Sequence, residues 1–133
     1  MTEQETFEKL QDLIRNVLGI PKEKILMESV LVGGLGAESI DLLDLSFLIE
    51  ETFNIVIEPN EFEKEVKKVI PGGIFEKNGY LTEEAIAELK KALPEVDQTR
   101  LITGLRKAEI PSLLTVAVFV HLIQRKMSLN PAN

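Results

Sequence analysis

Apolar residues recur every three or four positions through much of the chain, a spacing typical of amphipathic helices. Strand-like alternation is weak throughout. The helices predicted from this pattern cover residues 2–18, 39–53, 61–70, 82–93 and 112–126. The last of them is apolar on nearly all sides and is therefore expected to be buried. The pattern favours an all-α fold.

Residues that bond to free backbone groups mark the ends of several predicted helices. Thr2 and Glu5 have the spacing of a capping box at the start of the first helix. Ser39 is expected to be the N-cap of the second helix, because serine side chains accept hydrogen bonds from first-turn N–H groups. The connection over 20–37 holds several apolar residues and is expected to pack down, and an Asn78-Gly79 turn is expected farther on.

The predicted second helix is more apolar than the burial of one face requires. Its apolar residues are Ile40, Leu42, Leu43, Leu45, Phe47, Leu48, Ile49 and Phe53. A buried stripe about 100° wide would use four or five of these residues. The others are expected to face solvent, where they are available for contact with a partner.

Negative charge is concentrated on the same part of the chain. The chain has 22 acidic and 15 basic residues, for a net charge of −7. Between Lys24 and Lys64 there are nine acidic residues and no basic ones, whereas the remainder of the chain is +2. Acids at helix N-termini account for part of this stretch. Acids interleaved with surplus apolar residues predict a docking surface for basic partners and argue against nucleic acid as a partner.

The size and composition of the chain exclude several kinds of site. A chain of 133 residues, 44% of them hydrophobic, is expected to form one compact domain. Because it has no cysteine, it has no disulfide, thiolate nucleophile or cysteine-bearing zinc site. Its one histidine, His121, is expected to be a packed or boundary residue of the last helix and not a catalytic base or metal ligand. Calcium binding over 74–85 is not expected, because Ile74 and Ala85 would stand at the first and last ligand positions, and no metal site is expected elsewhere.

No segment is typical of export or of a membrane. Residues 1–12 lack the basic-then-apolar order of a signal peptide. The longest apolar run, over 113–123, is shorter than the roughly 20 residues that cross a bilayer. We therefore expect a cytoplasmic protein that is not transmembrane.

The strongest functional signal lies around Ser39. Residues 36–45 read GAESIDLLDL, and residues 50–57 read EETFNIVI. These strings resemble the acyl carrier protein family, whose signature is a small-residue turn, an Asp-Ser-Leu-type tripeptide, an acidic helix and a Glu-Glu-x-Phe exit. Residues 113–116 are similar to the family's entry into its last helix. Glu38 stands where the family usually has aspartate, and Ile40 stands where it usually has leucine.

The resemblance implies an acyl-carrier-protein-like antiparallel helix bundle with an extra inserted helical segment. It covers residues 2–61 and 113–126, whereas family members usually join these regions by a short connection. The chain is therefore expected to be a single acyl-carrier-like domain over 1–127 with an insertion over approximately 62–112. The loose C-terminal tail would be 128–133.

The resemblance also implies a prosthetic group. In the family, a phosphopantetheinyl transferase moves 4′-phosphopantetheine from coenzyme A to the serine, and the terminal thiol of the group then carries acyl chains as thioesters. This maps the covalent attachment point onto Ser39. The free N–H groups and the dipole at a helix N-terminus would favour the phosphodiester there, by about 0.3–1 kcal/mol.

A set of partners follows from the same resemblance. A monomeric carrier would present acyl chains to acyl synthases such as ketosynthases and to acyltransferases, each with a basic docking patch. Long family members specialised for unusual acyl chains include carriers implicated in lipopolysaccharide or lipid A assembly, so the expected pathway is fatty acid, lipid A, lipopolysaccharide or related biosynthesis. The residues assigned to partner contact are Glu38, Ile40, Asp41, Leu43, Asp44, Phe47, Glu50 and Glu51.

One other function is left open by the residues. An exposed serine before an amphipathic helix is, taken alone, more often a plain N-cap than a modification site. The alternative is therefore an unmodified helical interaction module that uses the acidic second helix as an adaptor surface. A hydrolase with Ser39 as nucleophile lacks a credible general base, so the protein is not expected to be an enzyme.

Overall fold

The computed structural model describes residues 1–58 and 61–128 of the chain. Helices dominate these residues, and their one sheet is a hairpin of two-residue strands, which confirms the predicted all-α class. The chain divides into two compact units. The first unit is Met1–Ile57 with the chain from Leu114 onward, and the inserted unit is Glu58–Leu113. No helix within the described ranges is long and apolar enough to cross a membrane.

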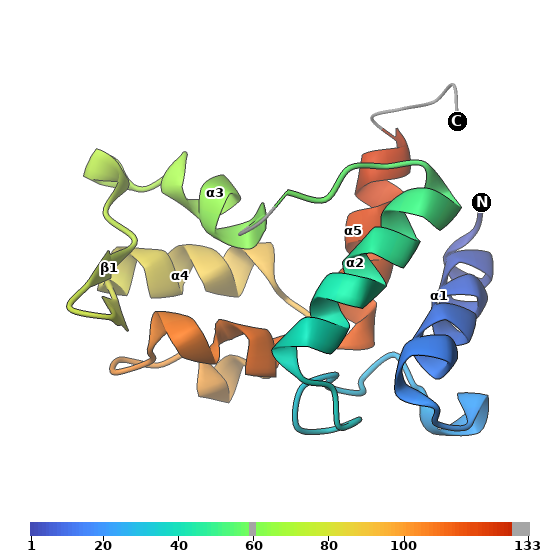
Figure 1. Cartoon of the computed structure of the whole chain (residues 1–133). Coiled ribbons are helices and arrows are strands. Elements are labelled where there is room, and N and C mark those ends of the chain that lie inside the picture. The colour runs from blue at the N-terminus through green and yellow to red at the C-terminus, as the bar shows by residue number, and fades with distance from the viewer. Residues whose placement is uncertain (59–60, 129–133) are drawn as a thin grey trace. The chain divides into compact units, whose positions relative to one another are not determined.

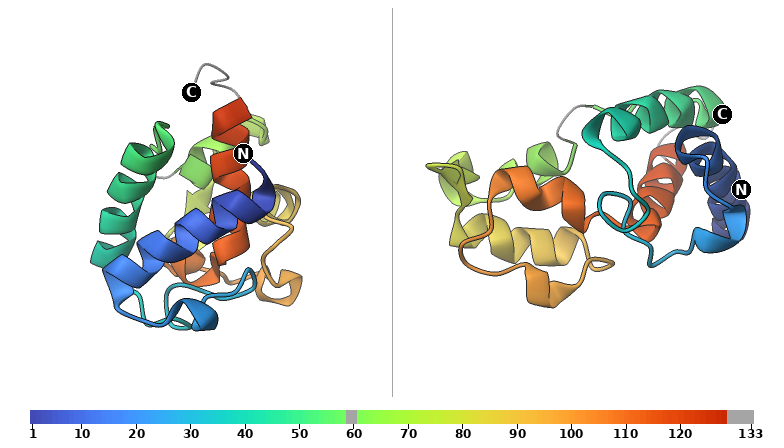
Figure 2. Two further views of the ribbon diagram at one scale, coloured as in Figure 1. Left: turned by 90° about the vertical axis from the view of Figure 1, so that its right-hand side faces the viewer. Right: turned by 60° about the horizontal axis from the view of Figure 1, so that its bottom comes forward.

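Three helices build the first unit, and the first of them packs against the other two. They are α1 (Glu3–Leu18), α2 (Ser39–Phe53) and α5 (Val116–Ser128). The helices α2 and α5 run in the same general direction, and α1 runs opposite to them (Figures 1 and 2). Their facing sides bury a core that includes Leu10, Ile14, Leu45, Ile49, Val120 and Ile123. This arrangement is the predicted antiparallel bundle.

The predicted capping box of α1 is present. The Thr2 backbone N–H donates to Glu5 Oε1 at 3.0 Å, and the Glu5 N–H donates to Thr2 Oγ1 at 3.1 Å. Because the Thr2 N–H stabilises the ionised carboxylate, the pKa of Glu5 is lowered. At the other end, Gly19 adopts a φ of 70° and closes the helix in a left-handed conformation that glycine takes without strain.

The connection between α1 and α2 packs against the start of α5, as its apolar residues predict. Val30 and Thr115 form an antiparallel bridge, and the Val116 N–H donates to the Ser29 carbonyl at 2.9 Å. This pairing holds the chain extended at Thr115. For that reason α5 begins at Val116, four residues after its predicted start.

The inserted unit has short elements around its own apolar core. In chain order they are α3 (Glu61–Lys67), η2 (Pro71–Gly73), β1 (Glu76–Lys77), β2 (Tyr80–Leu81), α4 (Glu83–Ala92), η3 (Gln98–Arg100) and η4 (Lys107–Leu113). The predicted Asn78-Gly79 turn joins the two strands, with a φ of 55° and 86° at its two residues. Buried side chains of this unit include Val66, Ile70, Phe75, Ile86, Leu89, Leu93 and Leu101.

Charged side chains join the elements of the inserted unit. Lys107 Nζ lies 2.7 Å from Glu63 Oε1 on α3 and 3.5 Å from Glu76 Oε1 on β1. The hydrogen bond to Glu63 is the main cause that raises the pKa of Lys107. Beside it, the Arg106 guanidinium carbon lies 5.4 Å from the centre of the Tyr80 ring. The α3 helix ends at Lys67, before the predicted residue 70, and its last predicted turn becomes the irregular approach to η2.

The outer limits of the predicted elements differ little from the structure. Ser128 is the last residue of α5, so most of the predicted tail over 128–133 lies outside the described residues. The inserted unit begins at Glu58 and ends at Leu113, and the single domain with an insertion over 62–112 stays a prediction.

Candidate functional site

The N-cap of α2 lies one residue earlier than the sequence predicts, although the helix covers the predicted residues 39–53. Glu38 is the N-cap, with an extended backbone at φ −103° and ψ 171°, and Ser39 is the first helical residue. The backbone N–H groups of Asp41 and Leu42 both donate to the Glu38 carbonyl, at 3.0 and 3.2 Å. The prediction that Ser39 is the N-cap was therefore wrong. The Asp41 carboxylate, which accepts from the Glu38 N–H at 2.8 Å, supports the earlier cap.

Ser39 is left with an unoccupied hydroxyl. Its side chain is exposed, and within residues 1–58 and 61–128 its Oγ makes no hydrogen bond. A serine that caps a helix instead uses its oxygen to accept from a first-turn N–H group. Ser39 thus combines a free hydroxyl with a place in the first turn of α2, beside the positive end of the helix dipole.

The chain that leads into α2 is held in place by backbone bonds. The Ala37 N–H donates to the Leu31 carbonyl at 3.0 Å, and both side chains are buried. Leu35 donates to the Val30 carbonyl at 2.9 Å, which closes the turn around Gly34. A Cβ added at Gly34 would lie 2.3 Å from that carbonyl oxygen, so only glycine fits. The position of Ser39 is therefore set by a packed loop on one side and by α2 on the other.

Two faces of α2 bear apolar residues. Leu45, Ile49 and Phe53 follow one another at four-residue spacing and are buried. On another face, Ile40, Leu43 and Phe47 are exposed over 64%, 55% and 59% of their surfaces. The expectation that some apolar residues of this helix face solvent is confirmed. These three exposed residues begin directly after Ser39 and extend along two turns of the helix.

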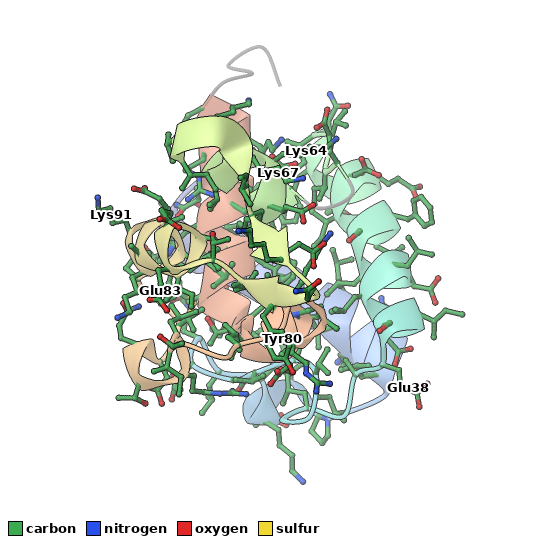
Figure 3. All side chains as sticks on the ribbon, turned by 90° about the vertical axis from the view of Figure 1, so that its left-hand side faces the viewer. Glu38, Lys64, Lys67, Tyr80, Glu83 and Lys91 are labelled. Atoms are coloured by element: carbon green, nitrogen blue, oxygen red, sulfur yellow. The ribbon has the colours of Figure 1, made fainter. Side chains whose placement is uncertain are left out.

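The five acidic residues predicted at this surface fall into two groups. Glu38, Asp44 and Glu51 are exposed, and Figure 3 places Glu38 at the N-terminal end of α2. Asp41 and Glu50 are half-buried and bond to the backbone of their own unit. Glu50 Oε2 accepts from the Ile57 N–H at 2.8 Å and so fixes the chain after α2. The sequence held a signal for the Asp41 bond, since an acid three residues after Glu38 has capping-box spacing.

The one histidine does not lie near Ser39. His121 Nε2 lies 3.7 Å from Glu3 Oε2, which stands in the first turn of α1. Since α1 and α2 run antiparallel, this pair is at the opposite end of the first unit from Ser39 (Figure 1). The segment over 74–85 forms the β1–β2 hairpin and the start of α4. Across the described parts of the chain, no group of three or more acidic or histidine side chains could hold a metal ion.

Comparison with known proteins identifies the family. Residues 8–67 match the family model described as phosphopantetheine attachment site. The acyl carrier protein of Cyanidium caldarium is 42% identical over 64 residues, which are 48% of this chain and 74% of that protein. The chain belongs to the acyl carrier protein family. The acyl carrier proteins of Guillardia theta and Clostridium acetobutylicum are 41% identical to this chain over 64 residues and 43% identical over 58 residues, respectively. The matches cover 48% and 44% of this chain, and 79% and 75% of those relatives.

Membership of the family gives the chain its general role. The acyl carrier protein is a phosphopantetheine-carrying carrier of acyl groups and not an enzyme, as the resemblance implied. Acyl chains, synthases and transferases are its classes of partner. The residues matched to the attachment-site model include the loop before α2 and all of α2. Much of the inserted unit lies beyond the match.

Proposed function

We propose that Ser39 is the attachment residue of this acyl carrier protein. The observation that carries the proposal is the exposed, unbonded hydroxyl in the first turn of α2, inside the matched attachment-site region. In the transfer, Ser39 Oγ would form a bond to the β-phosphorus of coenzyme A and lose its proton to a base of the transferase, while 3′,5′-ADP leaves. The positive end of the α2 dipole would then stabilise the phosphodiester charge. The bound group supplies a terminal thiol that holds acyl chains as thioesters.

The exposed face of α2 is proposed as the partner surface. Glu38, Asp44 and Glu51 would attract a basic patch, and Ile40, Leu43 and Phe47 would supply the apolar contact that slows dissociation. Asp41 and Glu50 would add to the negative field, although both also bond within the first unit. The absence of any lysine or arginine from residues 25–63 leaves this field uncompensated along the sequence.

We further propose where the carrier works. Its partners would be a phosphopantetheinyl transferase, acyl synthases such as ketosynthases, and acyltransferases of fatty acid, lipid A or lipopolysaccharide biosynthesis in the cytoplasm. The length of the chain supports a specialised member, because 64 aligned residues are 48% of this chain but 74% of the Cyanidium protein. The inserted unit would be an insertion within a single carrier domain over 1–127, and the formation of the first unit from segments on both sides of it supports an insertion.

The attachment residue can be tested with purified protein. The chain is incubated with coenzyme A, magnesium and a phosphopantetheinyl transferase of broad specificity, and the intact mass is measured. We expect a gain of one phosphopantetheine group, no gain with Ser39→Ala, and an undiminished gain with the matched control Ser46→Ala on the same helix. If the wild-type protein gains no mass, the unmodified interaction module is the better description. A gain that persists in Ser39→Ala would place the attachment elsewhere.

A further inference from the structure

The start of α2 has two competing capping arrangements. Serine is among the best N-cap residues, and a cap at Ser39 would direct its Oγ to the N–H groups of Asp41 or Leu42. The structure instead has the cap at Glu38, with the helix already formed at Ser39. The two arrangements differ by one residue in helix length. They also differ in whether the Ser39 oxygen is occupied by a hydrogen bond.

The Asp41 carboxylate holds the observed arrangement. Its Oδ2 accepts from the Glu38 N–H at 2.8 Å, a charge-assisted bond that fixes the N-cap residue. Asp41 also donates its own backbone N–H to the Glu38 carbonyl at 3.0 Å. Residue 37 is anchored separately by its bond to the Leu31 carbonyl. Asp41 is therefore the side chain whose removal would release the cap while the loop before it stays bonded.

We propose that Asp41 is a positioning residue for the modification of Ser39. By supplying the capping bond itself, Asp41 keeps Ser39 in the first helical turn with its hydroxyl free to react. This inference rests on the proposed attachment at Ser39. It gives Asp41 a role inside the carrier in addition to the partner contact assigned to it from the sequence.

Three variants separate positioning from charge. Asp41→Ala removes the acceptor and one charge. Asp41→Asn removes the charge but keeps a side-chain oxygen that can accept from the Glu38 N–H. Asp44→Ala removes one charge from an exposed residue on the same helix. The first measurement is kcat and KM for phosphopantetheine transfer from coenzyme A, with the carrier as the varied substrate.

A positioning role for Asp41 and a purely electrostatic role predict different kinetics for the three variants. If Asp41 positions Ser39, Asp41→Ala lowers kcat about 10- to 100-fold, the ratio expected from losing one charged hydrogen bond, and Asp41→Asn restores most of it. Asp44→Ala raises KM and leaves kcat near the wild-type value, because an exposed charge acts mainly on encounter. Equal kinetics for Asp41→Ala, Asp41→Asn and Asp44→Ala would overturn the proposal, since charge alone would then explain all three.

A structural measurement gives the proposal a second test that needs no transferase. In the unmodified protein, backbone chemical shifts should report Ser39 as helical, and the Glu38 amide should exchange slowly with solvent. In Asp41→Ala, the shifts of Ser39 should move toward extended values and the Glu38 amide should exchange faster. Unchanged shifts and exchange in Asp41→Ala would refute the positioning role even if Ser39 is modified. If the wild-type protein shows these shifts but is never modified, the attachment proposal fails instead.

Discussion

Two phenylalanines on α2 provide a matched test of its two faces. Phe47 is 59% exposed and Phe53 is 3% exposed, so the same truncation has different consequences at the two positions. Phe53→Ala leaves a cavity in the core of the first unit, and such truncations lower the free energy of unfolding by about 3–5 kcal/mol. Phe47→Ala removes a ring from the solvent-facing side, and its effect on that free energy should stay within about 0.5 kcal/mol.

The assay should follow the first unit alone, because the inserted unit has its own core. Urea unfolding monitored by the methyl resonances of Ile49 and Val120, both buried in the first unit, meets this requirement. Binding of each folded variant to an acyl synthase is measured alongside. We expect Phe47→Ala to weaken binding by about 1 kcal/mol or more while stability is retained. Equal destabilisation by the two truncations would mean that Phe47 is a core residue, and the reasoning about the partner face would be refuted.

Three further predictions concern local bonds. Gly34→Ala should lower the unfolding free energy of the first unit by about 1–3 kcal/mol, measured by urea unfolding, because the new Cβ would lie 2.3 Å from a backbone oxygen. The capping box of α1 lowers the pKa of Glu5, so the stability that the box adds to the first unit is present above the ordinary glutamate pKa and is lost as pH falls through the lowered pKa. An NMR titration of Glu5 with a midpoint at or above the ordinary glutamate pKa would contradict this. Lys107→Met should destabilise the inserted unit by about 1 kcal/mol in thermal unfolding, since it removes the nearer of the two cations beside the Glu63 carboxylate and leaves only Lys67 at 4.0 Å, whereas the surface control Lys91→Met should have little effect.

Local sequence signals predicted most of the helices and one of their caps. The capping box at Thr2 and Glu5 and the Asn78-Gly79 turn depend on neighbouring residues alone, and both are present. The start of α5 depends on a bridge between Val30 and Thr115, which are far apart in the sequence, so helical periodicity alone placed it too early.

The sequence predicted which residues form the candidate site better than it predicted how they are arranged. The motif drew attention to Ser39, but residue preference also suggested the wrong N-cap, because it weighed serine alone and not the carboxylate three positions beyond Glu38. The apolar residues of α2 surround the helix. Periodicity therefore could not tell which would be exposed, and packing against α1 decides that Phe47 faces solvent and Ile49 does not.

The proposed role of the protein depends on a prosthetic group attached to Ser39. The most direct measurement is peptide mass spectrometry of the protein purified from its native source, with fragmentation that locates the modified residue. We expect a phosphopantetheine group on the peptide that contains Ser39, with part of the population bearing an acyl chain on the terminal thiol. A native protein whose Ser39 peptide is entirely unmodified, or whose group is attached to another residue, would contradict it.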